Sequence, residues 1–239
     1  MKIAFALFAK PPVDDFVKTR LQKDLGTALS LQIYRLLLKW QRDNILSLQA
    51  GKNEFYKPSC TVFLAAPEDM SQKKATALFC ENTRLKKVKF RMQQAGSLGT
   101  KMSHAFRILL SENDIAVLWG SDVPLIQKTH LLQMSALHPG CAIIPAADGG
   151  YSAISISARY YSDAIFQGIP WSTKNTLAFQ KNNFEALKIP YTILDPSPDL
   201  DEIQDILTCI HHAEARGDAI SLERINELNL LLKSARKHN

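Results

Sequence analysis

The sequence has few cysteines and lacks the short patterns that mark many common enzyme sites. The cysteines are widely spaced, form no Cys-x-x-Cys pair and have no histidines at zinc-binding intervals: Cys60, Cys80, Cys141 and Cys209. We interpret them as buried thiols in a reducing compartment. A Walker loop, a dinucleotide-binding fingerprint, a nucleophile elbow and a His-Glu-x-x-His pair are also missing. These absences disfavour a P-loop enzyme, a zinc protein and a serine hydrolase.

Long apolar runs are missing as well. No run approaches the ~18 apolar residues that a membrane-spanning helix requires. The apolar stretch 3–9 near the N-terminus is too short for a signal peptide, and no small-residue cleavage site follows before Lys10. Apolar residues make up 46% of the chain and charged residues 22%, as in ordinary globular proteins. We therefore predict a cytoplasmic protein with no membrane span, in which residues 3–9 form a first strand.

Acidic residues are outnumbered by basic ones, 23 to 29, so the formal net charge is +6. A positive charge permits partners that carry phosphate. Part of it comes from the run 84–91, Arg-Leu-Lys-Lys-Val-Lys-Phe-Arg, which we interpret as a strand with one solvated basic face. Nucleic-acid binding would also need stacking aromatic residues or a recognition helix. We expect no nucleic-acid partner.

Apolar strands alternate with amphipathic helices along the 239 residues. The predicted strands are 2–9, 60–66, 86–91, 115–119, 141–146, 152–157 and 189–194. The predicted helices are about 25–50 (capped by Thr27), 70–80, 101–110, 127–137, one from about 172, 201–213 and 221–235. This alternation predicts an α/β fold with a mainly parallel sheet flanked by helices on both faces. Because no repeat or long linker interrupts it, we predict one domain over 1–239 that ends in the C-terminal helices of 201–235.

Three polar loops follow predicted strands at their carboxyl ends. They are the segment 10–20 after the first strand, Asp122 after strand 115–119, and Asp148 after strand 141–146. Ligands of open α/β sheets bind at this edge. We expect the three loops to converge on one crevice.

The first loop gathers cations in front of a helix. Lys10, Lys18 and Arg20, with Thr19 between the last two, could bind phosphate oxygens together with exposed backbone N–H groups. The alternative is a solvated basic loop whose charges pair with the acids at 14–15.

Two carboxylates follow later strands. Asp122, in Gly-Ser-Asp-Val-Pro-Leu, presents the hard oxygen that Mg²⁺ or Mn²⁺ prefers beside a diphosphate. It could equally be a helix cap or an Asx turn. Asp148, in Pro-Ala-Ala-Asp-Gly-Gly-Tyr, is typical of a hairpin turn, which can also point a carboxylate into a crevice.

Three weaker segments have conformational explanations that compete with a role in a site. Gly99 lies in a glycine-containing turn before a helix, where it could allow a ligand to approach the backbone. Trp171 could stack on a substrate or act as a hydrophobic staple for a helix capped by Ser172 or Thr173. The acids of 199–205 suit the first turn of a helix through its dipole alone.

Five blocks, in order and sensibly spaced, resemble a known family. They are Phe8 to Leu21, Leu98 to Phe106, Gly120 to Ile126, Pro145 to Tyr151 and Ile169 to Thr173. Together they are similar to the bacterial glycosyltransferase-like proteins of the arsenosugar-biosynthesis or selenodomain-associated type, long labelled a domain of unknown function.

The resemblance implies the glycosyltransferase-A fold, a Rossmann-like sheet of the nucleotide-diphospho-sugar transferase superfamily. It implies Mg²⁺ or Mn²⁺ held by Asp122 and Asp201, with Asp148 as the catalytic group that orients or deprotonates the acceptor. The implied nucleotide-binding residues are Lys10, Lys18, Thr19, Arg20, Gly99 and Ser121. The implied acceptor-binding residues are Gly149, Gly150, Tyr151, Trp171, Ser172 and Thr173.

The chain departs from the family pattern at four places. Asp15 and Phe16 stand where the family has Gly-Arg, and Ser97 stands where it has an acid. Ser152 and Ser155 replace an aromatic residue and a glycine, and the Asp-Thr-Pro-Glu-Asp-Leu block has become residues 201–206. These changes leave room for altered specificity or lost catalysis.

We therefore predict a metal-dependent transferase that moves a glycosyl group from a nucleotide sugar to a small acceptor. A nucleotidyltransferase, which joins a nucleoside triphosphate to a phosphorylated acceptor, would use the same fold and metal-binding acid. The departures favour a further alternative, a non-catalytic nucleotide-binding descendant. A purely structural domain, the weakest alternative, would have no nucleotide affinity.

Overall fold

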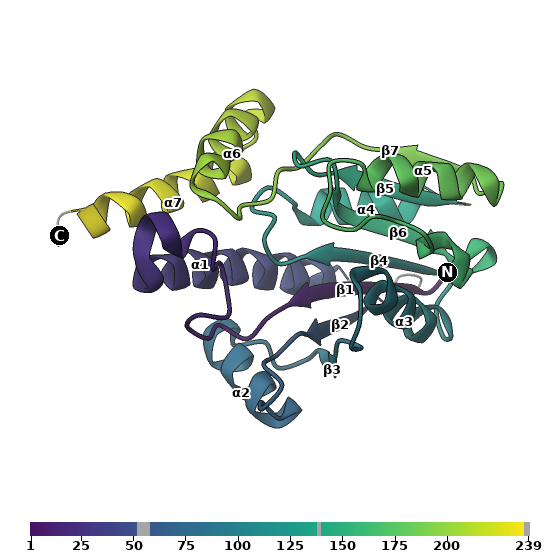
Figure 1. The fold of residues 1–239 in the computed structure, drawn as a ribbon, viewed down its shortest axis with the longest axis horizontal. Coiled ribbons are helices and arrows are strands. Elements are labelled where there is room, and N and C mark those ends of the chain that lie inside the picture. Colours follow the sequence, from purple (N-terminus) through teal and green to yellow (C-terminus); the bar gives the residue numbers. More distant parts are fainter. Residues whose placement is uncertain (52–57, 138–139, 237–239) are drawn as a thin grey trace.

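The computed structural model describes residues 1–51, 58–137 and 140–236. Its described strands form one seven-stranded sheet with the order β3-β2-β1-β4-β6-β5-β7 (Figure 1). The strands are β1 (Ile3–Ala9), β2 (Ser59–Leu64), β3 (Lys89–Met92), β4 (Ile115–Gly120), β5 (Cys141–Pro145), β6 (Tyr151–Ser157) and β7 (Tyr191–Ile193). Strands β3, β2, β1 and β4 are parallel neighbours, and β5 pairs in parallel with β7. Only β6 runs antiparallel to its neighbours β4 and β5, so the predicted mainly parallel sheet is confirmed for the described residues.

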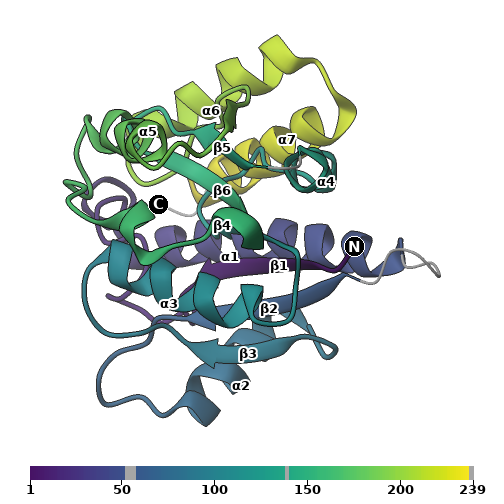
Figure 2. The same ribbon diagram turned by 90° about the vertical axis from the view of Figure 1, so that its right-hand side faces the viewer.

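Helices cover both faces of the sheet (Figure 2). They are α1 (Gln22–Ala50), α2 (Gln72–Thr83), α3 (Leu98–Leu110), α4 (Lys128–Ala136), α5 (Thr176–Ala186), α6 (Ile203–Arg216) and α7 (Ala219–Arg236), with short 3₁₀ turns η1 (Ala158–Tyr160) and η2 (Asp163–Phe166). Side chains alternate across each strand. One set packs against α1, α2, α4, α6 and α7, and the other against α3, α5 and η2.

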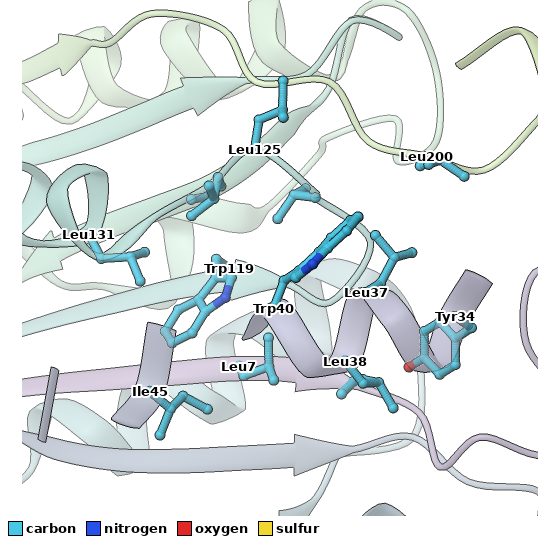
Figure 3. Close-up of a cluster of buried hydrophobic side chains, with 14 of the residues drawn as sticks. Leu7, Tyr34, Leu37, Leu38, Trp40, Ile45, Trp119, Leu125, Leu131 and Leu200 are labelled. Atoms are coloured by element: carbon cyan, nitrogen blue, oxygen red, sulfur yellow. The ribbon is translucent and has the colours of Figure 1, made fainter. Parts of the chain in front are cut away.

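The larger core lies between the sheet and α1 (Figure 3). Leu7 of β1 and Trp119 of β4 pack there against Leu37 and Leu38 of α1, and all four side chains are fully buried. The Trp119 Nε1 donates a 2.9 Å hydrogen bond to Gln41 Oε1, which satisfies the polar edge of the buried ring. This packing fixes the carboxyl ends of β1 and β4 relative to each other.

Two predicted helix starts are wrong. Helix α1 begins at Gln22 rather than at a cap on Thr27, and Gly26 (φ 75°, ψ 163°) interrupts it because glycine tolerates this non-helical backbone. Helix α5 begins at Thr176 with Asn175 in the cap position, so neither Ser172 nor Thr173 caps it. Ser172 has a left-handed backbone (φ 60°), and Thr173 Oγ1 donates to Pro170 O at 2.9 Å within the preceding turn.

Other expectations agree with the fold. Cys60, Cys141 and Cys209 are buried, and Cys80 is partly buried. The basic run 84–91 leads into β3, where Lys89 and Arg91 are exposed. The segment around Asp148 joins β5 to β6 in a hairpin, closed by a 3.1 Å hydrogen bond from Ala146 N to Gly150 O. Among the described residues, no helix is long and apolar enough to cross a membrane.

Candidate functional site

A pocket of about 430 Å³ lies at the carboxyl ends of β1 and β4. The three loops that the sequence predicts to converge all reach it, since Lys10, Asp122 and Asp148 are among its lining residues. Ten predicted site residues line it: Lys10, Lys18, Ser121, Asp122, Asp148, Gly150, Tyr151, Trp171, Ser172 and Asp201. The fold thus brings together residues that are up to 191 positions apart, from Lys10 to Asp201.

Lys18 lies between the two predicted metal-binding acids. Its Nζ donates a 2.6 Å hydrogen bond to Asp201 Oδ1 and lies 4.0 Å from Asp122 Oδ2. The Lys18 side chain is only 4% exposed, so its charge is directed into the site rather than into solvent. The backbone at Lys18 is left-handed (φ 50°), a conformation that is uncommon for residues other than glycine. The site therefore already holds a cationic group between two carboxylates.

Carboxylates crowd this part of the pocket. Burial raises the pKa of Asp122, although Lys18 partly opposes the shift. Burial, and then the charges of Asp122 and Asp148, raise the pKa of Asp199 to about 7. Burial also acts to raise the pKa of Asp201, but the charge and hydrogen bond of Lys18, together with the charges of Arg20 and Lys10, lower it. The raised pKa values of Asp122 and Asp199 indicate that additional positive charge in the pocket would stabilise their ionised forms.

Lys10 follows β1 on the same side of the pocket. Its Nζ lies 3.3 Å from Phe16 O and 4.8 Å from the centre of the Phe16 ring. Burial, opposed by Asp201, lowers the pKa of Lys10. Among the described residues, only backbone and ring atoms contact its ammonium group, so a phosphate oxygen could bind it without breaking an ion pair there.

Tyr34 of α1 is a pocket residue that the sequence analysis missed. Its hydroxyl accepts from Lys10 N (2.9 Å), donates to Lys10 O (3.0 Å) and lies 3.2 Å from Ser121 Oγ. It thereby joins the ends of β1 and β4, and burial raises its pKa. The helical spacing of Leu25 to Trp40 predicts packing at this position, and no local signal distinguishes a buried tyrosine that also binds backbone groups.

Aromatic residues line the predicted acceptor side. The rings of Tyr151 and Trp171 meet edge to face, with centroids 6.3 Å apart. Tyr151 Oη donates to Gln180 Oε1 at 3.1 Å. Asp148 is exposed at the hairpin, and its Oδ1 accepts from Gly150 N at 2.8 Å. Its other carboxylate oxygen makes no hydrogen bond with the described residues, which suits a role toward an acceptor hydroxyl.

Five predicted residues do not line the pocket. Thr19 is exposed, and Arg20 forms a 3.4 Å contact with Glu202 Oε1 while its side chain stays 64% exposed. Three others have local roles: Gly99, Gly149 and Thr173. A Cβ on Gly99 would lie 2.8 Å from Trp171 Nε1, and one on Gly149 would lie 2.3 Å from the carbonyl oxygen of Lys174. Both glycines therefore permit close packing rather than ligand contact.

Two departures from the family pattern keep the local backbone. Asp15 stands in place of glycine and has a left-handed backbone (φ 56°), which Asp tolerates better than most residues. Ser97 stands in place of an acid and caps α3, since its Oγ accepts from Thr100 N at 3.2 Å. Serine and aspartate are comparable caps. The backbone at Asp15 is thus one that the glycine of the family pattern would also adopt, and the cap at Ser97 is one that an aspartate would also provide.

Asp199, Gln93 and Lys101 also line the pocket but were not predicted as site residues. The sequence offered a partial signal for two of them. Asp199 is one of the acids of 199–205 that the dipole of helix 201–213 explains, and Lys101 lies in the first turn of the helix after the Gly99 turn. Gln93 follows the exposed strand β3, and its Nε2 donates to Phe63 O at 3.1 Å.

The donor set fits a hard divalent cation of the Mg²⁺ type. Asp122 and Asp201 present carboxylate oxygens on either side of the Lys18 ammonium, so a cation is already stabilised in this position. No group of three or more acidic, histidine or cysteine side chains suited to hold a metal occurs in the described part of the chain. Mg²⁺ commonly takes one or two carboxylates and completes its shell with water and substrate phosphates. The site fits that pattern.

The fold is shared with other proteins of known structure. The structure superimposes on a candidate nucleotide-diphospho-sugar transferase from Desulfovibrio desulfuricans G20 with a TM-score of 0.78, at 21% identity over 98% of this chain and 97% of the other. It also resembles a nucleotidyl transferase from Methanothermobacter thermautotrophicus (TM-score 0.55, 14% identity, 88% and 96% covered). A 4-diphosphocytidyl-2C-methyl-D-erythritol synthase from Anaerococcus prevotii DSM 20548 is similar too (TM-score 0.51, 7% identity, 86% and 95% covered). At these identities the similarity establishes the nucleotide-diphospho-sugar transferase fold.

The sequence comparison then gives the family. The chain belongs to the family of uncharacterized proteins conserved in bacteria, DUF2064, whose profile matches residues 53–173. The resemblance drawn from the five sequence blocks is thereby confirmed. A comparison with curated proteins gives no match. The matched segment includes Asp122 and Asp148, whereas Lys18 and Asp201 lie outside it.

Proposed function

We propose that the protein is a metal-dependent transferase with a nucleotide-activated donor, and that it transfers a glycosyl group from a nucleotide sugar to a small acceptor. One observation carries the proposal: Lys10 and Lys18 share a pocket with Asp122 and Asp201 at the carboxyl ends of β1 and β4. Cations and carboxylates in one pocket suit a diphosphate bound together with a divalent cation. The superimposed proteins support this reading through their fold.

On the donor side, Lys10 and Lys18 would bind phosphate oxygens. Their ammonium groups act as point charges that stabilise the negative charge gained by the leaving diphosphate. Asp122 and Asp201 would hold Mg²⁺ or Mn²⁺, which supplies Lewis-acid stabilisation of the same charge when bound. For Lys18 to bind phosphate, its 2.6 Å contact with Asp201 must lengthen or be shared.

On the acceptor side, Asp148 would orient a hydroxyl group and accept its proton. The bond between the anomeric carbon and the diphosphate oxygen breaks, and a bond to the acceptor oxygen forms. Trp171 and Tyr151 would position the acceptor by contact with its apolar surface. Lys10, Lys18 and Asp148 thus divide the pocket into a leaving-group side and a nucleophile side.

The ligand itself is the first test. Thermal unfolding is measured with nucleoside triphosphates, nucleoside diphosphates and nucleotide sugars, each with and without Mn²⁺. A ligand at ~100 times its dissociation constant adds about 2.7 kcal/mol of stability, which raises the melting temperature by a measurable amount. The largest rise is expected with a nucleotide sugar and Mn²⁺ together.

Other outcomes of this test have definite meanings. A rise with triphosphates alone would replace glycosyl transfer by nucleotidyl transfer, the activity for which the superimposed protein from Methanothermobacter is named. Stabilisation without turnover of a broad acceptor panel would support a non-catalytic nucleotide-binding protein. No rise with any nucleotide would overturn the proposed function.

A further inference from the structure

The loop after β4, residues 121–127, is bound along its backbone by side chains from three helices. We name it the β4 loop. Its four consecutive carbonyls 123–126 all accept hydrogen bonds from helix side chains, at 2.7–3.0 Å: Val123 O from Gln41, Pro124 O from Arg224, Leu125 O from Arg216, and Ile126 O from Arg224 and Asn44. Gln41 and Asn44 belong to α1, Arg216 to α6 and Arg224 to α7. This arrangement holds the segment that directly follows Asp122.

Arg216 also contacts the second acid-bearing segment. Residues 194–201, which we name the acid segment, carry Asp199 and Asp201 to the pocket. Arg216 Nη1 donates to Leu125 O at 2.8 Å, and its Nη2 donates to Pro196 O at 2.9 Å. The planar guanidinium therefore joins the two segments through both of its terminal nitrogens.

The two segments also contact each other next to the acids. Leu200 N donates to Asp122 O at 2.9 Å, which joins the acid segment to the β4 loop. The acid segment is also bound to the end of β5, where Ser197 N donates to Pro145 O at 2.9 Å. The Leu200 contact places Asp201 beside Asp122, where both reach Lys18. The bridge made by Arg216 lies behind this contact, on the side of α6.

The partners of Arg216 are informative. Both of its hydrogen bonds go to backbone carbonyls, and it forms no salt bridge with a carboxylate among the described residues. A guanidinium that binds only carbonyls of two different loops contributes geometry rather than charge neutralisation. Its helix, α6, lies beyond the family-matched residues 53–173, as does the acid segment that it binds.

We propose that Arg216 is a positioning residue that holds the acid segment against the β4 loop and so keeps Asp201 beside Asp122. The effect of this placement on donor binding rests on the proposed function, whereas the contact of Arg216 with both segments does not. Arg224 supports the same β4 loop from α7 but does not reach the acid segment. Of the two arginines that bind the β4 loop, Arg216 is therefore the one that also binds the acid segment.

The test compares Arg216→Gln and Arg216→Lys with the parent protein. Amide hydrogen exchange is followed at Ser197 and Leu200, with Phe5 and Leu7 of β1 as internal references. Loss of charge-assisted hydrogen bonds should make the Ser197 and Leu200 amides exchange about tenfold faster in Arg216→Gln. Lysine keeps the charge, but its single ammonium nitrogen does not reproduce the two separate terminal nitrogens of the planar guanidinium, so Arg216→Lys should also exchange about tenfold faster. The exchange of Phe5 and Leu7 should not change.

Arg107→Gln is the control, because Arg107 is an exposed arginine near the end of α3. Its Nη2 lies 2.6 Å from Asp163 Oδ2, and neither residue lines the pocket. This variant should leave the Ser197 and Leu200 amides unchanged. Binding of Mn²⁺ with the nucleotide that stabilises the parent protein is measured in parallel by calorimetry. Both Arg216 variants should bind this pair about tenfold more weakly, a loss that corresponds to about 1.4 kcal/mol.

Three results would overturn the proposal: unchanged exchange at Ser197 and Leu200 in Arg216→Gln, equal acceleration at Phe5 and Leu7, or full restoration by Arg216→Lys. The first would remove the link, the second would make it a general contribution to folding, and the third would make charge its only role. If the parent protein binds no nucleotide, the proposed function fails, yet the exchange measurement still decides whether Arg216 links the two segments.

Discussion

The loops after β1 and β4 both reach the pocket, but helix side chains bind the backbone of the two loops to different extents. The β4 loop has four consecutive carbonyls bound by side chains of α1, α6 and α7. In the loop after β1, residues 10–21, helix side chains bind the backbone only near its two ends: Tyr34 binds Lys10 N and O, and Gln22 donates to Val17 O at 3.0 Å, among the described residues. Turns within the loop, such as Val13 N to Pro11 O at 2.9 Å, and the ion pair between Lys18 and Asp201 hold the rest. The loop also contains left-handed backbone at Asp15 and Lys18.

Because of this difference, the charged groups of Asp122 and Lys18 are held in the site by different kinds of contact. Asp122 belongs to a segment whose backbone is fixed by the scaffold, so it is preorganised for a ligand. Lys18 is held by a carboxylate for which a phosphate or a metal ion would compete. We therefore expect ligand binding to change the contacts of the β1 loop and to leave those of the β4 loop in place.

The largest expected effect comes from the fixed side. Asp122→Asn should weaken Mn²⁺-dependent nucleotide binding at least about 100-fold, because the amide cannot act as an anionic oxygen ligand. The melting temperature should stay the same or rise, since burial raises the pKa of Asp122 and so disfavours its ionised form. Calorimetry measures the first effect and thermal unfolding the second.

Asp114→Asn is the control for that experiment, because Asp114 precedes β4 at its opposite end and accepts from Lys2 N at 2.7 Å. It should bind the nucleotide like the parent protein. Unchanged binding in Asp122→Asn would remove Asp122 from the proposed metal site.

A smaller effect, with opposite signs for two ligands, is expected on the β1 side. Lys18→Met should weaken binding of a nucleoside diphosphate in the presence of EDTA about tenfold, because a charge-assisted contact to phosphate is lost. Binding of Mn²⁺ alone should become tighter, since the ammonium no longer occupies the position between Asp122 and Asp201. Both affinities are measured by calorimetry, with Lys23→Met on exposed α1 surface as control. A parallel loss of both affinities would contradict competition between Lys18 and the metal.

The smallest effect concerns the backbone of the β1 loop. Asp15→Gly should increase the free energy of unfolding by about 0.5 kcal/mol, because glycine adopts the left-handed backbone (φ 56°) without a steric penalty. Urea unfolding measures the change. Asp14→Gly, whose position has no positive φ, should instead lower stability by a similar amount. If Asp15→Gly lowers the free energy of unfolding as much as Asp14→Gly, the left-handed backbone at Asp15 is not strained.

The periodicity of apolar residues and the positions of turn-forming residues in the sequence predicted most of the fold. The seven apolar strands and the helices between them follow from alternation and helical spacing, and the rule that ligands bind at strand carboxyl ends correctly placed Lys10, Asp122 and Asp148 in one pocket. Helix starts were less predictable, because a glycine at 26 and the turn at 172–173 shift them by a few residues.

The contacts that complete the site could not be predicted from the sequence, because they join segments that are far apart along the chain. The bonds from Tyr34 to Lys10 and from Arg216 to Leu125 join segments 24 and 91 residues apart, and each donor lies on a helix whose spacing predicts only packing. The ion pair of Lys18 with Asp201 spans 183 residues. Such pairs depend on how helices sit on the sheet, which local patterns do not encode.

The outer strand β3 has a consequence for how the protein behaves at high concentration. It forms one edge of the sheet, and its exposed positions are occupied by Lys89 and Arg91. A strand from a second molecule that approached this edge would bring two further copies of these cations against the first pair, and like charges in cross-strand positions repel. Part of the basic run that contributes to the net charge of +6 thus lies along a sheet edge, where we expect it to disfavour strand pairing between two copies of the chain.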